Sequence, residues 1–261
     1  MLMKKNLSCL LYIILVFKLF TANAADIPKD AGLFANAHTG QTGNAEKQVK
    51  QLEPAPSVTD PSKPMIALTF DDGPSKHTPR ILDALERHGG RATFFTVGYL
   101  LNENKDTVLR AHNMGCEIVG HTWDHSDLTI LSDREIINQL TSTNNAIKNI
   151  TGTEKLMYRP PYGRMSEKVR RVSGELGFST VTWSLDTRDW QTKNAQLIYL
   201  AVMQNVKAGD IIIAHDMHGT TADAMEYIIP ALVKQGFQLV TVSELLTDKY
   251  GSMKAGIVYT N

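Results

Sequence analysis

The order in which apolar runs and helical segments follow one another constrains the fold of this chain more than any other feature. Seven short apolar runs have the length of β-strands: residues 65–70, 92–97, 117–120, 156–159, 178–185, 210–214 and 237–242. Between them, apolar residues recur at helical spacing over residues 79–88, 105–113, 134–150, 166–176, 195–206 and 222–234. Strands that alternate with helices predict an α/β fold with a parallel sheet and helices outside it. The periodicity leaves open whether the sheet closes into a barrel.

The N-terminus has the pattern of an export signal. Lys4 and Lys5 precede an apolar run over residues 7–17, and Ala22-Asn23-Ala24 matches a signal-peptidase cleavage site. The run is shorter than the ~20 residues that a membrane-spanning helix needs. We therefore expect a signal peptide over residues 1–24, cleaved near Ala24, and a secreted or periplasmic protein without stable membrane insertion. A signal that is retained as an anchor is the alternative.

Composition indicates where the folded domain begins and ends and which partners to expect. Residues 25–62 are rich in small and polar residues and predict a flexible leader. The folded domain is expected over residues 63–250, followed by a C-terminal tail over residues 251–261. The chain has 27 basic and 27 acidic residues, which gives no electrostatic reason to expect a nucleic-acid partner. We expect a monomer, and once the signal peptide with Cys9 is removed, Cys116 has no cysteine to pair with.

Two adjacent carboxylates, Asp71 and Asp72, follow the first apolar run and precede a Gly73-Pro74 turn. Side chains alternate between the two faces of a strand, and like charges this close resist being buried together. The pair is therefore either solvated in a turn or held by a positive group. In a parallel sheet, chemistry gathers at the carboxyl ends of the strands, and this pair stands at one of them.

A histidine pair follows the third apolar run. His121 and His125 are four residues apart, so their rings lie on the same side if the segment turns helically. Two imidazoles and one carboxylate would make a three-ligand metal site that leaves a coordination position for water. Taken alone, the pair also fits a capped turn with one buried and one exposed histidine. The HExxH pattern is absent, which excludes the zinc-peptidase arrangement.

Three further strand ends carry polar residues. Arg159 precedes two prolines and Tyr162, in a turn whose backbone the prolines make rigid. Asp189 and Trp190 follow the fifth apolar run and fit either a helix cap beside a core residue or a carboxylate beside a sugar-stacking wall. His215 ends the sixth apolar run and is expected to lie half-buried at the mouth of a site.

Together these residues resemble the five motifs of the polysaccharide deacetylase family, whose members are also called NodB-homology domains and carbohydrate esterase family 4. The matching segments, in order, are TFDDGP at 69–74, HTWDH at 121–125, RPPYG at 159–163, DTRDW at 186–190 and IAHD at 213–216. The resemblance covers about residues 63–247. In the last motif, Ile213 stands where the family usually has leucine. The resemblance implies a single domain with a distorted (β/α)7-type barrel and a zinc-dependent N-deacetylase activity.

The resemblance also implies roles for individual residues. The implied ligands of Zn²⁺, or of another divalent transition metal, are Asp72, His121 and His125. Asp71 would be the general base with Arg159 as its charge partner, and His215 would be the general acid, tuned by Asp189. The backbone N–H of Tyr162 would help to hold the oxyanion, and the groove would be lined by Tyr162, Trp190 and Ile213.

The sequence leaves several interpretations open, both of the substrate and of the class of protein. The first choice of partner is an N-acetylated glycan, in particular N-acetylglucosamine residues of peptidoglycan. Chitin oligosaccharides, poly-N-acetylglucosamine and O-acetylated xylan are alternatives. A non-catalytic glycan-binding module is expected to have lost Asp71 or His215, and both are present. An iron oxygenase with two histidines and one carboxylate shares the ligand types, but its ligands usually lie on a double-stranded β-helix.

Overall fold

The described part of the chain, residues 59–261 of a computed structural model, is built on one curved sheet of parallel strands. The strands are β1 (Met65–Asp71), β2 (Thr93–Thr96), β3 (Glu117–Gly120), β4 (Met157–Tyr158), β5 (Ser179–Val181), β6 (Leu185–Asp186), β7 (Ile211–His215), β8 (Gln238–Leu239) and β9 (Val258–Tyr259). Their order is β6-β7-β1-β2-β3-β4-β5-β9, and β8 pairs with the start of β1. The predicted parallel α/β fold is confirmed. The predicted signal peptide and residues 25–58 of the predicted leader lie outside the described residues.

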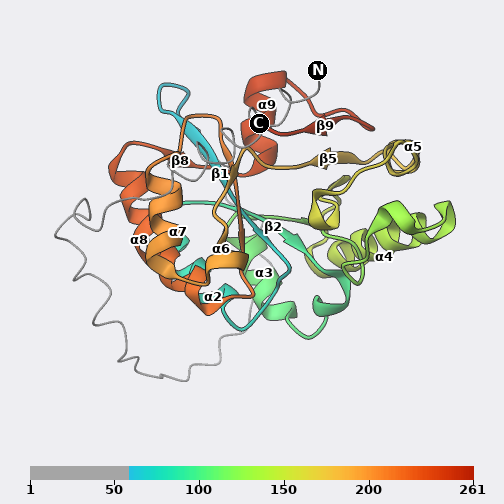
Figure 1. Ribbon diagram of the computed structural model, residues 1–261, viewed down its shortest axis with the longest axis horizontal. Coiled ribbons are helices and arrows are strands. Elements are labelled where there is room, and N and C mark those ends of the chain that lie inside the picture. The colour runs from blue at the N-terminus through green and yellow to red at the C-terminus, as the bar shows by residue number, and fades with distance from the viewer. Residues whose placement is uncertain (1–58) are drawn as a thin grey trace, which may run out of the picture. The chain divides into compact units, whose positions relative to one another are not determined.

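Helices connect the strands, and most of them cover the outside of the sheet, whereas α9 packs against the interior core. They are α2 (Thr78–Arg87), α3 (Lys105–Asn113), α4 (Asp133–Thr151), α5 (Glu167–Glu175), α6 (Asp189–Thr192), α7 (Ala195–Met203), α8 (Gly219–Lys234) and α9 (Val242–Tyr250), with short 3-10 turns η2 (Gly98–Leu100), η3 (Leu128–Ile130) and η4 (Pro161–Gly163). Figure 1 shows α2, α7 and α8 packed together on one side of the sheet, with α4 and α5 towards the other. Within residues 59–261, no helix combines the length and the apolar character needed to cross a membrane.

Strand β1 shows how the sheet places its side chains. All seven of its residues are buried, as expected when both faces of a parallel strand are covered. Ile66, Leu68 and Phe70 pack into the larger core under the helices. The alternate residues Met65 and Ala67 belong to a second core inside the curve of the sheet. Because the faces alternate, Thr69 and Asp71 point into that interior too.

The chain between β5 and β6 explains why the sheet curls. Strand β5 pairs with β4 and β9 at one end of the sheet, whereas β6 pairs with β7 at the other end. Residues 182–184 alone join them, and each residue spans at most ~3.6 Å, so the two ends of the sheet must lie close together. The prediction of one strand over residues 178–185 is therefore wrong, because a continuous apolar run hides the change of direction.

The C-terminal segment, predicted to be a tail, contributes a strand to the sheet. Thr180 and Val181 of β5 pair with Val258 and Tyr259 of β9. Tyr259 is buried in the interior core. The segment before β9 also runs close to α5: a Cβ on Gly174 would stand 2.9 Å from the backbone of Gly256. Residues 251–261 are thus packed against the domain.

Candidate metal centre and active-site pocket

A pocket of about 390 Å³ lies at the carboxyl ends of the strands. Eight of the ten residues predicted for the site line it: Asp71, Asp72, His121, His125, Tyr162, Trp190, Ile213 and His215. The other two, Arg159 and Asp189, are fully buried behind it. The pocket is also lined by Trp183 and Asp186, which the sequence reasoning did not assign to the site. Asp186 opens the DTRDW motif, but Trp183 lies within residues 178–185, for which the sequence predicts one continuous strand.

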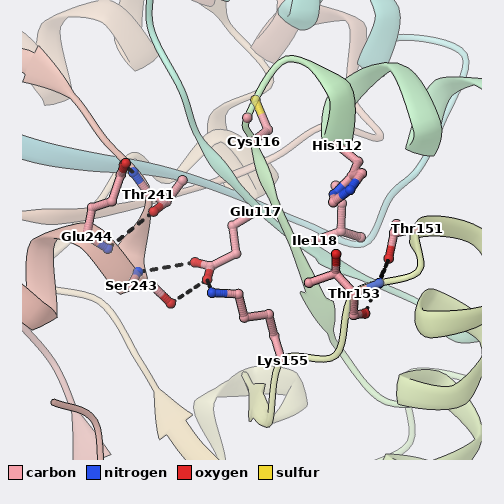
Figure 2. A pocket seen from close by; sticks show the side chains of 11 residues that line it. His112, Cys116, Glu117, Ile118, Thr151, Thr153, Lys155, Thr241, Ser243 and Glu244 are labelled. Carbon is pink, nitrogen blue, oxygen red and sulfur yellow. Dashed lines mark hydrogen bonds and ion pairs between the residues drawn. The ribbon is translucent and has the colours of Figure 1, made fainter. Parts of the chain in front are cut away.

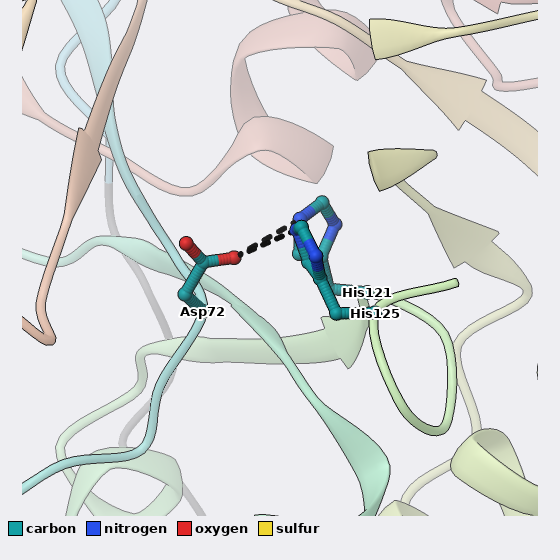
Figure 3. Close-up of side chains that lie close together, drawn as sticks. All are labelled: Asp72, His121 and His125. Atoms are coloured by element: carbon teal, nitrogen blue, oxygen red, sulfur yellow. Dashed lines mark ion pairs between the residues drawn. The ribbon is translucent and has the colours of Figure 1, made fainter. Parts of the chain in front are cut away.

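Three donor atoms converge at one side of this pocket (Figure 3). The Oδ1 atom of Asp72 lies 3.4 Å from Nε2 of His121 and 3.2 Å from Nε2 of His125. The Nδ1 atom of His121 is 2.8 Å from the carbonyl oxygen of Arg159. A carbonyl oxygen only accepts hydrogen bonds, so Nδ1 carries the proton and Nε2 keeps its lone pair for the pocket.

This donor set fits a metal ion. Within residues 59–261, no group makes a hydrogen bond to the buried Oδ1 of Asp72. A carboxylate oxygen and an imidazole lone pair repel each other unless a proton or a cation lies between them. Burial disfavours the charged form of Asp72, but the two imidazoles outweigh it and hold the pKa of its carboxyl well below the usual value. Two histidines and a carboxylate are a common ligand set for divalent transition metals.

Asp71 faces the same space but is held differently. Its Oδ1 accepts a hydrogen bond from Nη1 of Arg159 at 2.6 Å, and its Oδ2 lies 3.8 Å from Nε2 of His121. Arg159 also donates to Thr69 Oγ1 and to the carbonyl oxygens of residues 181 and 182. Its guanidinium lies 3.9 Å from the centre of the Phe95 ring. Arg159 therefore fixes one oxygen of Asp71 and leaves the other facing the metal ligands.

Half-buried His215 forms a second pair, with the fully buried Asp189. Nδ1 of His215 lies 2.7 Å from Oδ1 of Asp189, and the His215 backbone N–H donates to Oδ2 at 2.6 Å. Thr221 donates to that Oδ2 as well. Burial alone would lower the pKa of His215, but the ion pair with Asp189 outweighs it and raises the pKa to about 9. His215 is therefore set to stay protonated at neutral pH, with Nε2 available to the pocket.

The loops that carry these residues contain strained backbone. A positive φ is uncommon for residues other than glycine and often marks functional sites. The non-glycine residues with positive φ in these loops are Asp72, Thr122, His125, Tyr162 and Arg188. Such conformations let the chain turn the ligand side chains sharply out of the strand direction. Sequence patterns do not reveal them, because none of these residues is glycine.

The three residues predicted to contact substrate line the pocket. Tyr162 and Trp190 are 63% and 52% exposed, as a wall for sugar rings requires, whereas Ile213 is buried at the base. The Tyr162 ring meets the His125 ring edge-on at 4.8 Å. A Cβ on Gly163 would stand 2.8 Å from the Trp183 ring, so this glycine lets Trp183 approach the rigid turn after β4.

A second pocket, of about 320 Å³, lies at the amino-terminal end of β3 (Figure 2). Its buried carboxylate, Glu117, accepts hydrogen bonds from Thr93 and from Ser243, and lies 3.8 Å from Nζ of Lys155. Polar groups that are already paired with one another are typical of structural contacts. The pocket at the carboxyl ends of the strands is therefore the candidate active site.

Comparison with known proteins bears on this site. Residues 59–181 match the sequence model of a family described as Polysaccharide deacetylase. The peptidoglycan-N-acetylglucosamine deacetylase PgdA of Listeria monocytogenes serotype 1/2a is 40% identical over 185 residues, which are 70% of this chain and 39% of that protein. A peptidoglycan-N-acetylglucosamine deacetylase of Bacillus cereus is 37% identical over 210 residues, 77% of this chain and 98% of that protein.

A solved structure resembles the fold as well. The peptidoglycan deacetylase PdaC of Bacillus subtilis is 38% identical and matches with a TM-score of 0.70, over 74% of this chain and 95% of that chain. The chain thus spans less than half of the Listeria protein and nearly all of the Bacillus cereus one. The similarity therefore extends beyond the motifs to the whole parallel domain.

Proposed function

The chain belongs to the polysaccharide deacetylase family, and on that basis we propose that it is a secreted or periplasmic, metal-dependent N-deacetylase. Its proposed substrate is N-acetylglucosamine in peptidoglycan, the glycan named for the Listeria and Bacillus cereus relatives. One observation carries the proposal. A three-donor metal site lies beside a carboxylate with one free oxygen, in the same pocket as a histidine whose pKa is raised to about 9.

The residues that would hold the metal are Asp72, His121 and His125, whose ligand atoms lie close together. A divalent cation such as Zn²⁺, if bound there, would polarise the acetyl carbonyl and lower the pKa of bound water to about 7. The carbonyl oxygen of Arg159 keeps His121 in the tautomer that presents Nε2. The chain itself thus orients a ligand before any ion binds.

Asp71 is the proposed general base. Deacetylation requires a group that takes a proton from the attacking water. Oδ1 of Asp71 is occupied by Arg159, so Oδ2 is the atom that accepts the proton. The buried guanidinium keeps this carboxylate in one orientation and compensates its charge.

His215 is the proposed general acid. The departing amine needs a proton, and Nε2 of His215 is the atom that donates it, because Nδ1 is bound to Asp189. Asp189 acts as a positioning residue that favours the protonated ring. Tyr162, Trp190 and Ile213 would hold the acetylated sugar between these two groups.

The test is acetate release by the protein from peptidoglycan strands, chitin oligosaccharides, poly-N-acetylglucosamine and acetylated xylan, with Zn²⁺ and with a chelator. We expect chelator-sensitive release, greatest from peptidoglycan. Asp71→Asn and His215→Ala should still bind the metal and lose ~10²–10⁴-fold in kcat. No release from any of these substrates with Zn²⁺ restored would refute the proposal, and near-normal release by either variant would refute that residue's role.

A further inference from the structure

An arginine outside the proposed catalytic set stands beside the pocket. Arg164 follows the rigid turn η4, and its guanidinium carbon lies 5.4 Å from the centre of the Tyr162 ring. Tyr162 in turn meets the ring of the metal ligand His125 at 4.8 Å. A single aromatic ring therefore separates this guanidinium from the metal centre.

A single hydrogen bond orients the guanidinium. Nη1 of Arg164 donates to Oδ2 of Asp127 at 2.6 Å. Asp127 is itself anchored, because its Oδ1 accepts from the backbone N–H and the hydroxyl of Thr129. Its side chain is 11% exposed, whereas that of Arg164 is 63% exposed. An anchored carboxylate thus pins one edge of an otherwise exposed cation.

The other edge of the guanidinium remains available. Within residues 59–261, the remaining side-chain N–H groups of Arg164 make no hydrogen bond. A guanidinium presents its donors in a planar fork that matches a carboxylate, and holding it by one edge reduces the entropy lost on binding. Asp127 neutralises part of the charge, so we expect a moderate and selective contribution to binding.

We propose that Arg164 binds a carboxylate carried by the glycan strand and so selects anionic glycans over neutral ones. The inference rests on the proposed function, because the muramic acid units of peptidoglycan carry lactyl groups and peptide stems with carboxylates. Chitin oligosaccharides carry none. Tyr162 would stack on the sugar while Arg164 contacts its substituent. This makes Arg164 a specificity-determining residue on the side of the pocket formed by the loop after β4.

The experiment compares three tetrasaccharides that differ in charge. They are an N-acetylglucosamine tetramer, a peptidoglycan-derived tetrasaccharide of alternating N-acetylglucosamine and N-acetylmuramic acid with free lactyl carboxylates, and the same compound with those carboxylates amidated. Acetate release gives kcat and KM for the wild type, Arg164→Gln and Arg164→Lys. Arg87→Gln is the control, since Arg87 is a similarly exposed arginine paired with one carboxylate, Glu226, between α2 and α8.

Arg164→Gln should raise KM for the free-carboxylate compound about tenfold and change KM for the other two less than twofold. Arg164→Lys should recover part of the loss, and 0.5 M salt should reduce the wild-type preference. Arg87→Gln should resemble the wild type on all three. An equal loss on all three compounds would mean that Arg164 only supports Tyr162, and no loss on any would mean that it binds nothing. Either result overturns the proposal.

A binding measurement tests this inference independently of the proposed deacetylase activity. Calorimetric titration of each tetrasaccharide into the metal-free protein does not depend on turnover. We expect the wild type to bind the free-carboxylate compound more tightly than the amidated one, and Arg164→Gln to bind them equally. Equal binding by the wild type would overturn the inference even if the enzyme is active. Charge-selective binding without acetate release would leave the inference standing and count against the deacetylase proposal.

Discussion

At the scale of single residues, Asp71 and Asp72 are neighbours in the chain with different surroundings. Asp71 is the last residue of β1 and points into the interior of the sheet, where Arg159 binds it. Asp72 has left the strand with a φ of 72° and faces two imidazoles. The buried arginine compensates the charge of Asp71, and the charge of Asp72 is available to a cation. This division is why two adjacent carboxylates can both be sheltered from water.

The His215–Asp189 pair predicts a pH dependence. The folded protein raises the pKa of His215 from 6.5 to about 9, so the pair stabilises the fold fully below pH 6.5 and loses that contribution as pH rises through 9. Asp189→Asn removes the partner, and the pKa of His215 should then fall by more than one unit. NMR titration of the histidines in metal-free protein measures this directly. The alkaline limb of the kcat profile should move to lower pH with it.

Asp223→Asn is the control for that experiment, because Asp223 is an exposed carboxylate on α8 that pairs with Arg80. It should leave the His215 titration unchanged. An Asp189→Asn protein whose His215 still titrated near pH 9 would show that Asp189 does not set the pKa.

The close packing around Gly73, which follows Asp72 in the chain, predicts that a side chain at this position would be crowded. A Cβ at this position would stand 2.2 Å from both carboxylate oxygens of Asp216, which is fully buried. Gly73→Ala should therefore lower the free energy of unfolding by about 1–3 kcal/mol, as overpacking does. Urea unfolding measures the loss. If crowding is the cause, the substitution should cost less in an Asp216→Ala background; equal costs in both backgrounds would exclude it.

At the scale of helices and strands, local sequence patterns predicted the helices better than they predicted where the strands end. Ser132 and Glu135 form a capping box at the start of α4, a pattern that can be recognised locally because its hydrogen bonds join near neighbours in the sequence. The division of residues 178–185 into β5 and β6 depends on which distant strands each half pairs with. Periodicity within the run carries no such information. The pairing of β9 was missed for the same reason.

The pairing and burial of strand β9 predict that the C-terminal segment stabilises the domain. Tyr259 is 7% exposed and packs in the interior core, whereas its neighbour Val258 is 41% exposed. Tyr259→Ala should lower the free energy of unfolding by about 3 kcal/mol. Val258→Ala leaves strand β9 in place and should lower the free energy of unfolding by under about 1 kcal/mol. Denaturant midpoints of the two variants give the comparison, and equal losses would mean that burial at Tyr259 contributes little.

At the scale of the whole molecule, the sequence predicted the parallel architecture. The ten residues proposed for the site line one pocket or lie buried behind it, but the contacts behind them could not be predicted. Arg159 was assigned to Asp71 through the family resemblance. Its bonds to Thr69 and to the backbone at residues 181 and 182 depend on the curl of the sheet. Trp183 and Arg164 belong to no motif, and their places near the pocket follow from how strand ends far apart in the sequence meet.

The candidate metal site predicts that metal stabilises the whole domain, since Asp72, His121 and His125 lie after the ends of β1 and β3. An ion that binds only the folded state stabilises it, by about 2.7 kcal/mol when its free concentration is one hundred times Kd. Zn²⁺ should therefore raise the thermal midpoint of chelator-treated protein by roughly 5–10 °C for a domain of this size. Asp72→Asn removes a ligand and should abolish most of this shift. Differential scanning fluorimetry across a Zn²⁺ titration measures it.

Asp71→Asn is the matched control for that titration, because it alters the neighbouring carboxylate and leaves the three ligands in place. It removes the charge that compensates buried Arg159, so its midpoint without metal should fall below that of the wild type. The rise on adding Zn²⁺ should nevertheless be retained. A Zn²⁺ shift lost equally in both variants would contradict the separate roles proposed for Asp71 and Asp72. A shift kept in Asp72→Asn would place the metal elsewhere.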